Sequence, residues 1–453
     1  MTDQYQDLYQ SYRWLVPEHF NIANYCCHRW ATNPQDVHQQ AAIFFEDQVG
    51  QLTMYSYRQL SERVNKLANG LVRMGVQSQD RIIISLQHSA DSAVAMLAAF
   101  TVGAIAVPLT AGLSSYQYAP RVIDSQAKVA IIDKHTLAPF MASLDNQTLV
   151  KQIIGIDTQD DRMIALETLL ARQANQFTAV NTSSDSPAIM VYPQPEPSTE
   201  PLDRKIKNEI PFDPDLKATI LTHRTLIGAL PGFVASQNWF PRKNDILWSS
   251  YDWNSGLGLI NSLLPALYFG HTIVGCPAGR TIPRLLTLLE HYQVTNVLTT
   301  ADELERIREH EESPPGFELA IRCVAIPDHE KTAELQEWVK DRFKASLNGV
   351  YSDIGFVYLV GDSVQKWPDR DNSMGHVFPG RRYSIIDDEG MPVNNGTKGF
   401  LAVAAIDYHG HDDPGLATHY WQQAQIHEIE TVDGWYSTNI VAYQDDDGYI
   451  FRA

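Results

Sequence analysis

The chain has 453 residues, of which 44% are hydrophobic, and carries a formal net charge of -19 at pH 7. A chain of this length exceeds one compact core, so two or three packed subdomains are expected. The negative charge disfavours binding to nucleic acid or to an anionic membrane surface, because both attract clustered Lys and Arg residues.

The four cysteines, Cys26, Cys27, Cys276 and Cys323, show no Cys-x-x-Cys spacing and no accompanying cluster of His and Cys residues. We therefore expect neither a disulfide framework nor a zinc site, and we predict no metal site. The residues after Met1 do not form a basic segment followed by an apolar one. This start predicts a protein without a secretory signal that resides in the cytoplasm.

The first half of the chain alternates between helical and extended hydrophobic patterns. The apolar stretch 93–109 is short for a membrane span and contains Gly103 and Pro108, so it predicts a buried helix that leads into a buried strand. The predicted helices of this half are 57–75, 92–100 and 116–125, and the predicted strands are 81–85, 104–107 and 129–132.

A second run with the same alternation predicts helices at 221–236, 257–267 and 282–292 and strands at 246–249, 272–274 and 297–298. Such alternation predicts an α/β fold with two doubly wound, mainly parallel subdomains. After residue 373, short strands separated by turns predict a smaller β-rich, barrel-like subdomain. The expected segments are a first α/β subdomain at 1–192, an insertion at 193–215, a second α/β subdomain at 216–372 and the β-rich subdomain at 373–453.

Residues 193–215 differ from the rest of the chain in composition, because they include six prolines and six acidic residues. This composition predicts a loop rather than a packed helix or strand. We favour a solvated surface insertion, and a segment that docks onto a partner protein is the alternative.

Short motifs along essentially the whole chain share their order and spacing with one superfamily. They are Pro17-Glu-His-Phe-Asn-Ile-Ala-Asn-Tyr-Cys-Cys27, Gly103-Ala-Ile-Ala-Val-Pro-Leu109, Asp252-Trp253, Leu263-Leu-Pro-Ala-Leu-Tyr-Phe-Gly270, Ser373-Met-Gly375, Pro379-Gly380 and Asp447-Gly-Tyr449. Together they resemble the adenylate-forming acyl-CoA synthetases, in particular the acetyl- and medium-chain branch. The resemblance implies a large domain of two α/β layers and a β-barrel-like portion that binds ATP and a carboxylic acid. It also implies a small C-terminal domain, which we expect to be absent because the chain ends at Phe451-Arg452-Ala453.

In that superfamily a loop rich in Gly, Ser and Thr holds the phosphates of ATP with its backbone N–H groups. Here Tyr192 is followed by Pro-Gln-Pro-Glu-Pro, and no glycine occurs between Ile156 and Ile227. Proline lacks the N–H donor and acidic side chains repel phosphate, so this loop is not expected to bind ATP. Lys217 aligns with the lysine that ends the motif, and we interpret it as a relic.

Three other nucleotide positions also depart from the superfamily pattern. The small-residue turn of the adenine slot corresponds to Pro327 and its neighbours, which are bulky or charged. The magnesium motif Tyr-Gly-x-Thr-Glu aligns with Tyr351-Ser-Asp-Ile-Gly355, so Ile354 replaces the hydroxyl and Gly355 replaces the carboxylate. The aspartate of the ribose clamp Thr-Gly-Asp aligns with Ile440.

The size of these losses decides between weak and absent nucleotide binding. At about 2 kcal/mol for each of four charge-assisted contacts, the sum is about 8 kcal/mol, or nearly six decades of affinity. Asp353 is an alternative oxygen ligand for magnesium. We therefore expect no catalytic residue and no cofactor, and ATP with magnesium only if the site is non-standard.

The segment Asp252-Trp253-Asn-Ser-Gly256-Leu-Gly258 resembles the one that lines the acyl pocket in relatives. The resemblance implies a vestigial acyl pocket lined by Trp253, Gly256, Gly258 and Tyr351, in which Trp253 limits the length of the ligand. The alternative, which we favour for a buried aromatic residue, is that these residues only pack the interior.

These observations predict a catalytically inactive relative of the synthetases with a binding or regulatory role. Its expected partners are an active paralogue, another protein or a small acyl ligand. The alternative is an acyl-CoA ligase or acyl-adenylating enzyme with a non-standard site, or with a small domain supplied by another chain. A third interpretation is a product without a selected role, although the intact hydrophobic patterning indicates a chain still required to fold.

Overall fold

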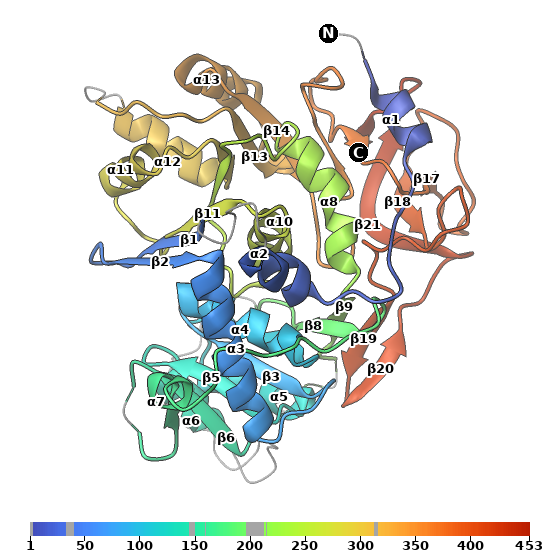
Figure 1. Ribbon diagram of the computed structural model, residues 1–453. Helices are drawn as coiled ribbons and strands as arrows, with labels where there is room; N and C mark the ends of the chain where they lie inside the picture. The colour runs from blue at the N-terminus through green and yellow to red at the C-terminus, as the bar shows by residue number, and fades with distance from the viewer. Residues whose placement is uncertain are drawn as a thin grey trace.

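The computed structural model describes residues 3–32, 40–144, 150–158, 160–195, 213, 215–311 and 316–453. In this part of the chain, two nine-stranded sheets lie one above the other and a four-stranded antiparallel sheet lies beside them (Figure 1). The predicted α/β fold with a smaller β-rich part is therefore confirmed.

The first sheet is parallel at its centre, where β3 pairs with β4 and β5. Its strands, in spatial order, are β20 (Gln425–Glu428), β19 (His419–Gln422), β9 (Ala218–Thr222), β8 (Pro187–Val191), β4 (Ile105–Pro108), β3 (Arg81–Ser85), β5 (Val129–Asp133), β6 (Gln152–Ile156) and β7 (Ile164–Ala165). The accompanying helices are α3 (Tyr57–Arg73), α4 (Ala90–Thr101), α5 (Ser115–Ser125), α6 (Leu137–Ser143) and α7 (Leu166–Leu170).

The second sheet is also parallel at its centre, where β14, β13, β12, β10, β11 and β1 lie side by side, and it is antiparallel only at its edges. Its strands, in spatial order, are β16 (His376–Val377), β15 (Val360–Gly361), β14 (Ser346–Tyr351), β13 (Cys323–Pro327), β12 (Asn296–Leu298), β10 (Ile246–Ser249), β11 (Thr272–Gly275), β1 (Ala41–Glu46) and β2 (Leu52–Ser56). Its helical elements are α8 (Thr225–Ser236), α9 (Gly256–Gly258), the π-helix η3 (Leu259–Leu263), α10 (Leu264–Tyr268), α11 (Ile282–His291), α12 (Ala301–Glu311) and α13 (Ala333–Phe343).

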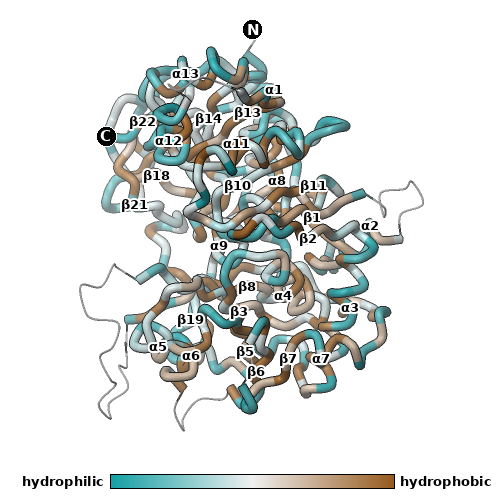
Figure 2. The backbone as a smooth tube through the Cα atoms, turned by 90° about the vertical axis from the view of Figure 1, so that its left-hand side faces the viewer, coloured by the Kyte–Doolittle hydropathy of each residue, from teal (hydrophilic) through white to brown (hydrophobic). Residues whose placement is uncertain are grey.

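Helices α3, α4, α8 and α10 lie between the two large sheets and contribute to one core that both sheets share. Helix α4 is buried at every residue except Asp91, which explains its uniformly apolar sequence. Outer helices such as α12 instead show hydrophilic residues (Figure 2). The predicted buried helix and strand at 93–109 are thus confirmed, and no helix in the described ranges is long and apolar enough to cross a membrane.

The third sheet has the order β17 (Tyr383–Ile386), β18 (Gly399–Ala404), β21 (Trp435–Gln444) and β22 (Ile450–Arg452). The N-terminal helix α1 (Tyr5–Ser11) lies beside this sheet. Tyr5 of α1 donates a hydrogen bond to the backbone oxygen of Val377 at 2.8 Å. The first residues of the chain are therefore held against segments that come more than 300 residues later.

Two details differ from the sequence-based expectation. The predicted helix 221–236 is wrong at its start, because Ala218–Thr222 form β9, which pairs with the buried strand β8, and the helix begins only at Thr225. The large sheets also exchange strands across the expected segment boundaries, since β1 and β2 lie in the second sheet and β9, β19 and β20 lie in the first. The insertion at 193–215 falls largely outside the described residues.

A buried ion pair connects the β-rich part to the segment that follows β14. Arg381 and Asp413 lie 2.8 Å apart, with side chains only 1% and 0% exposed. The Arg381 guanidinium also donates to the backbone oxygen of Val357. Gly415 permits this arrangement, because a Cβ atom there would collide with the guanidinium. We call this pair, with its bond to Val357, the Arg381 clamp.

Removing one member of the clamp should destabilise the protein strongly. We expect Arg381→Met to lower the free energy of unfolding by about 3–5 kcal/mol, because the Asp413 carboxylate stays buried without its partner. Urea unfolding followed by circular dichroism measures the loss. Arg162→Met, which removes an exposed arginine paired with Asp160, is the control and should leave the midpoint unchanged. Equal midpoints for both variants would contradict the clamp.

Candidate ligand-binding site

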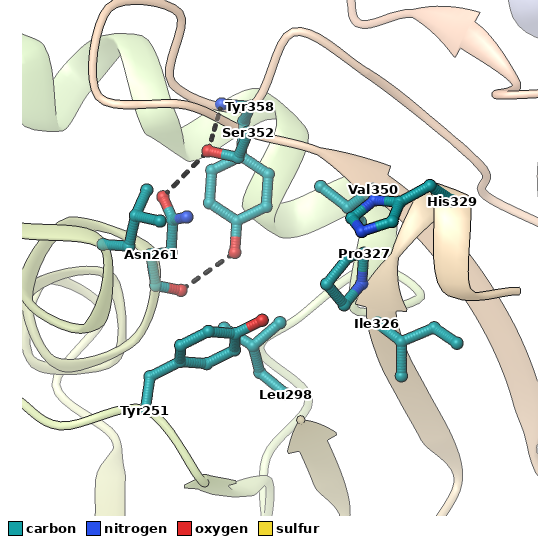
Figure 3. A pocket seen from close by; sticks show the side chains of 10 residues that line it. Tyr251, Asn261, Leu298, Ile326, Pro327, His329, Val350, Ser352 and Tyr358 are labelled. Carbon is teal, nitrogen blue, oxygen red and sulfur yellow. Dashed lines mark hydrogen bonds between the residues drawn. The ribbon is translucent and has the colours of Figure 1, made fainter. Parts of the chain in front are cut away.

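A small cavity lies at the carboxyl ends of the parallel strands β12, β13 and β14, the position at which α/β sheets commonly bind ligands. Its volume is about 170 Å³. Figure 3 shows the side chains that converge on it from these strands, from η3 and from the segment after β14. They are Tyr251, Leu257, Asn261, Leu298, Ile326, Pro327, His329, Val350, Ser352 and Tyr358.

Three of these residues form a hydrogen-bonded group at one side of the cavity. The Ser352 hydroxyl lies 3.1 Å from Asn261 Oδ1 and accepts the backbone N–H of Tyr358 at 2.9 Å. The Tyr358 hydroxyl donates to the backbone oxygen of Asn261 at 2.8 Å. Burial raises the pKa of Tyr358, so this hydroxyl stays protonated and fixes η3 against the segment after β14.

The remaining wall is mostly apolar. Among the described lining residues none is acidic and none is Lys or Arg. His329 lies at the exposed side, with Nδ1 3.9 Å from Asp328 Oδ1 and Nε2 4.0 Å from Glu330 Oε1. Asp328 is itself bound by the guanidinium of Arg452 at 3.0 and 3.1 Å. The cavity can therefore surround an apolar group but offers little to a phosphate chain.

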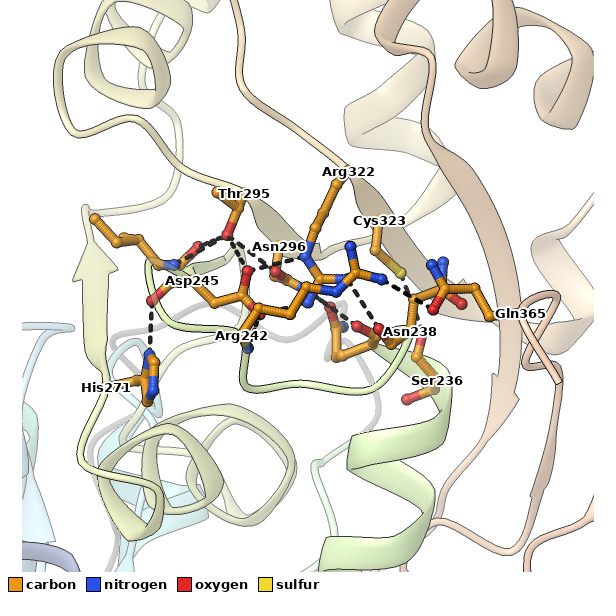
Figure 4. A network of polar contacts seen from close by, with 12 residues as sticks. Ser236, Asn238, Arg242, Asp245, His271, Thr295, Asn296, Arg322, Cys323 and Gln365 are labelled. Atoms are coloured by element: carbon orange, nitrogen blue, oxygen red, sulfur yellow. Dashed lines mark hydrogen bonds and ion pairs between the residues drawn. The ribbon is translucent and has the colours of Figure 1, made fainter. Parts of the chain in front are cut away.

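The opposite ends of the same strands are joined by a polar network (Figure 4). Arg322, just before β13, donates from Nε to Asp245 at 2.9 Å and from Nη1 to the backbone oxygen of Asn238 at 2.9 Å. Asn348 of β14 donates to the backbone oxygen of Ser236 at 2.6 Å. The network ties the strands to the end of α8 and so fixes the spacing of the strands that frame the cavity.

The residues predicted for an acyl pocket do not line this cavity. Tyr351, Gly256 and Gly258 are each adjacent in sequence to a residue that does. Trp253 is fully buried and packs edge-on against His88, with ring centres 4.8 Å apart. A Cβ atom on Gly256 would come within 2.7 Å of Val191, and one on Gly258 would collide with the backbone oxygen of Asp252. These glycines permit close packing of the turn before η3.

Tyr351 is the last residue of β14, and Ile354 and Gly355 lie in the segment that follows it. The Tyr351 ring is half-buried and faces Arg452, whose guanidinium carbon is 5.7 Å from the ring centre. Ile354 is also half-buried and packs toward Gly256, where a Cβ atom would lie only 2.8 Å from its Cδ1. The backbone N–H of Gly355 donates to Asp353 Oδ1 at 3.0 Å. The Asp353 carboxylate thus closes a local turn.

The other nucleotide positions are spread over the structure. Pro327 lines the cavity. Lys217 is exposed, and its Nζ lies 4.8 Å from the centre of the Tyr420 ring. Ile440 follows Asn439, which has a positive φ of 60°, at an irregularity in the pairing of β21 with β18. Asparagine tolerates the left-handed conformation that the glycine of Thr-Gly-Asp would adopt readily.

Sequence reasoning missed Tyr251, Asn261 and Tyr358 as cavity residues. Tyr251 directly precedes the Asp252-Trp253 motif, and this place in the sequence was the one indication that it belongs to the site. Asn261 lies within an apolar helical run, and nothing in the sequence distinguishes its side chain from a tolerated polar residue. Among the described residues, no group of three or more His, Cys, Asp or Glu side chains could hold a metal ion.

A family model described as AMP-binding enzyme matches residues 29–193 and 215–407, so the chain belongs to this family. An acetyl-coenzyme A synthetase of Nitrosomonas europaea is 22% identical over 97% of this chain and 68% of that protein. A mitochondrial acyl-coenzyme A synthetase of Mus musculus is 22% identical over 99% of this chain and 74% of that protein.

Solved structures share the fold. An acyl-CoA synthetase of Brucella canis superimposes with a TM-score of 0.83 at 18% identity, covering 100% of this chain and 79% of that one. An anthranilate CoA ligase in complex with anthranoyl-AMP gives 0.78 at 17% identity, covering 96% and 78%. The resemblance to the acyl-CoA synthetases is therefore confirmed at the level of family and fold.

The hydrogen-bonded group beside the cavity gives a stability prediction. We expect Ser352→Ala to lower the free energy of unfolding by about 1–2 kcal/mol, because the N–H of Tyr358 loses its acceptor in a partly buried place. Ser11→Ala, which alters an exposed hydroxyl 3.4 Å from the oxygen of Leu8, is the control and should have no measurable effect. Thermal unfolding of both variants tests this, and equal melting temperatures would show that the group contributes nothing.

Proposed function

We propose that this chain is a member of the AMP-binding family that does not adenylate and that binds a short carboxylic acid or acyl group in the cavity beside Tyr358. The observation that carries the proposal is the wall of the cavity, whose described residues include no carboxylate, Lys or Arg. Magnesium needs oxygen ligands and a triphosphate needs cations or backbone donors, whereas a short acyl group needs apolar walls and a hydrogen-bonding partner.

The volume of the cavity supports the same class of ligand. A cavity of about 150 Å³ holds a molecule of the size of benzene, whereas sites for larger ligands measure about 300–1,000 Å³. The cavity here, at about 170 Å³, suits a short acyl chain or one ring. Acetyl-coenzyme A synthetases are among the relatives, which supports a short acid as the ligand.

The former magnesium motif supports the absence of adenylation. Ile354 fills space against Gly256 with an aliphatic side chain, and Gly355 offers no carboxylate. A protein that binds without turnover acts through its contacts, so we propose an active paralogue or another protein as its partner. Its four cysteines are buried thiols, which suits a reducing compartment such as the cytoplasm.

Calorimetric titration can test both halves of this proposal. We expect no heat of binding with ATP and magnesium. We expect heat of binding with one of acetate, propionate, butyrate or benzoate, and that acid should raise the free energy of unfolding of the protein. At about ten times the dissociation constant, the bound acid should add about 1.4 kcal/mol to the free energy of unfolding. Leu257→Trp, which fills the half-buried side of the cavity, should abolish this gain, whereas Leu15→Trp at a residue 86% exposed should preserve it.

The enzyme alternative has its own readout. Hydroxylamine traps an acyl-adenylate as a hydroxamate, so ATP-dependent hydroxamate formation above background would contradict the proposal and favour an acyl-CoA ligase with a non-standard site. Micromolar ATP binding would do the same. Silence of the unaltered protein with every acid, or a gain in stability that Leu257→Trp retains, would remove the ligand-binding half.

A further inference from the structure

A second, larger cavity lies between the N-terminal segment, helix α8 and the segment before β16. Its volume is about 440 Å³, within the range of about 300–1,000 Å³ that is usual for ligand pockets. It shares no lining residue with the cavity beside Tyr358. This cavity is therefore a separate site.

Three aromatic side chains contribute to its wall. Tyr12, Trp239 and Trp367 line it together with aliphatic residues of α8 such as Leu230 and Val234. Their rings offer broad flat surfaces, on which another ring stacks favourably. The wall thus suits a flat hydrophobic molecule rather than a sugar or a nucleotide phosphate.

Two unsatisfied donors belong to the same wall. The indole Nε1 atoms of Trp239 and Trp367 are buried and have no hydrogen-bond partner among the described residues. Trp367 is only 1% exposed. Buried indole N–H groups normally find an acceptor, and leaving one unpaired costs about 1–3 kcal/mol.

The charges around this cavity are positive, although the whole chain is acidic. Arg13 lines it at an exposed position, and no described lining residue is acidic. The Nζ of Lys366 lies 4.8 Å from the ring centre of Trp239. A ligand with a carboxylate would therefore meet favourable charge at the entrance.

The conformation of Trp239 is unusual and firmly held. Asn238 and Trp239 both have positive φ angles, 49° and 61°, and such residues persist where the surrounding structure over-determines them. The backbone N–H of Trp239 donates to the backbone oxygen of Val234 at 2.8 Å, and Arg322 of the network in Figure 4 donates to the backbone oxygen of Asn238. The indole is thus held in place before a ligand arrives, which lowers the entropic cost of binding.

We propose that this cavity binds an aromatic carboxylate, with its ring against the aromatic side chains of the wall and its carboxylate near Arg13. The proposal rests on the second cavity alone and stands independently of the function proposed above.

The probe is 2-naphthoate, whose two fused rings are too large for the one-ring cavity beside Tyr358. In protein labelled with ¹⁵N-tryptophan, we expect its titration to shift the indole resonances assigned to Trp239 and Trp367. Arg13→Gln should raise the dissociation constant about tenfold, because a charge-assisted contact is lost. The methyl ester of the probe should bind more weakly for the same reason.

Matched variants separate the two cavities. Val234→Trp, which fills the second cavity, should abolish the shifts, and Leu257→Trp, which fills only the first, should preserve them. If Val234→Trp fails to fold by circular dichroism, Arg13→Gln and the ester decide the matter. No shift at millimolar 2-naphthoate, equal affinity of acid and ester, or loss of binding in Leu257→Trp would overturn the proposal.

Discussion

The Arg381 clamp is the interaction on which the shape of the candidate site depends. A fully buried ion pair is costly to desolvate, and it persists only with good geometry and further hydrogen bonds. Here Arg381 supplies both, because it binds Asp413 at 2.8 Å and also the backbone oxygen of Val357. Burial raises the pKa of the Asp413 carboxyl, and the Arg381 guanidinium opposes that shift. The pair thus fixes the segment after β14 at the residue before Tyr358, whose hydroxyl holds η3.

The same constraint explains why α8 carries glycines. The helix approaches the loop at Gly415 so closely that a Cβ atom on Gly228 would collide with its backbone, and one on Gly232 would lie 2.5 Å from Tyr358. Side chains at these positions would push the clamp and the wall of the cavity away from the helix. Helix α8 packs against Tyr358, which lines the first cavity, and α8 itself lines the second cavity. Both sites therefore depend on the position of α8.

Periodicity predicted much of the fold, because the helices between the two sheets have to bury most of their surface. Helix α4 and strands β3 and β5 lie within a few residues of their predicted ranges. The exchange of strands between sheets could not be predicted in this way. The pairing of β1 with β11, which aligns Ile43 with Ile273, joins residues far apart in the sequence, and local patterns carry no information on such contacts. The last two residues of β9, Leu221 and Thr222, fell within the predicted helix because the apolar residues of β9 run almost directly into those of α8.

The candidate site shows the same limit at the scale of side chains. Comparison with a motif identified Pro327, which lines the cavity, and Ile354, which lies two residues after the lining residue Ser352. It could not show that Tyr251 faces the cavity while Trp253, two residues later, faces His88 in the core. The direction of a side chain in a turn is set by tertiary packing rather than by the residue type.

Gly256 and Ile354 show how closely the segment after β14 packs against the turn before η3. Ile354 stands where the superfamily motif has a hydroxyl, and its Cδ1 occupies the place that a Cβ atom on Gly256 would need, at 2.8 Å. Val191, at the end of β8, closes the same space from the first sheet, with 2.7 Å to that Cβ position. A smaller polar residue at 354 would therefore leave a void between the two sheets, and a void costs packing energy in proportion to its volume. The glycine, the valine and the isoleucine form one packing unit, so a smaller residue at position 354 would weaken the contact between the turn before η3 and strand β8.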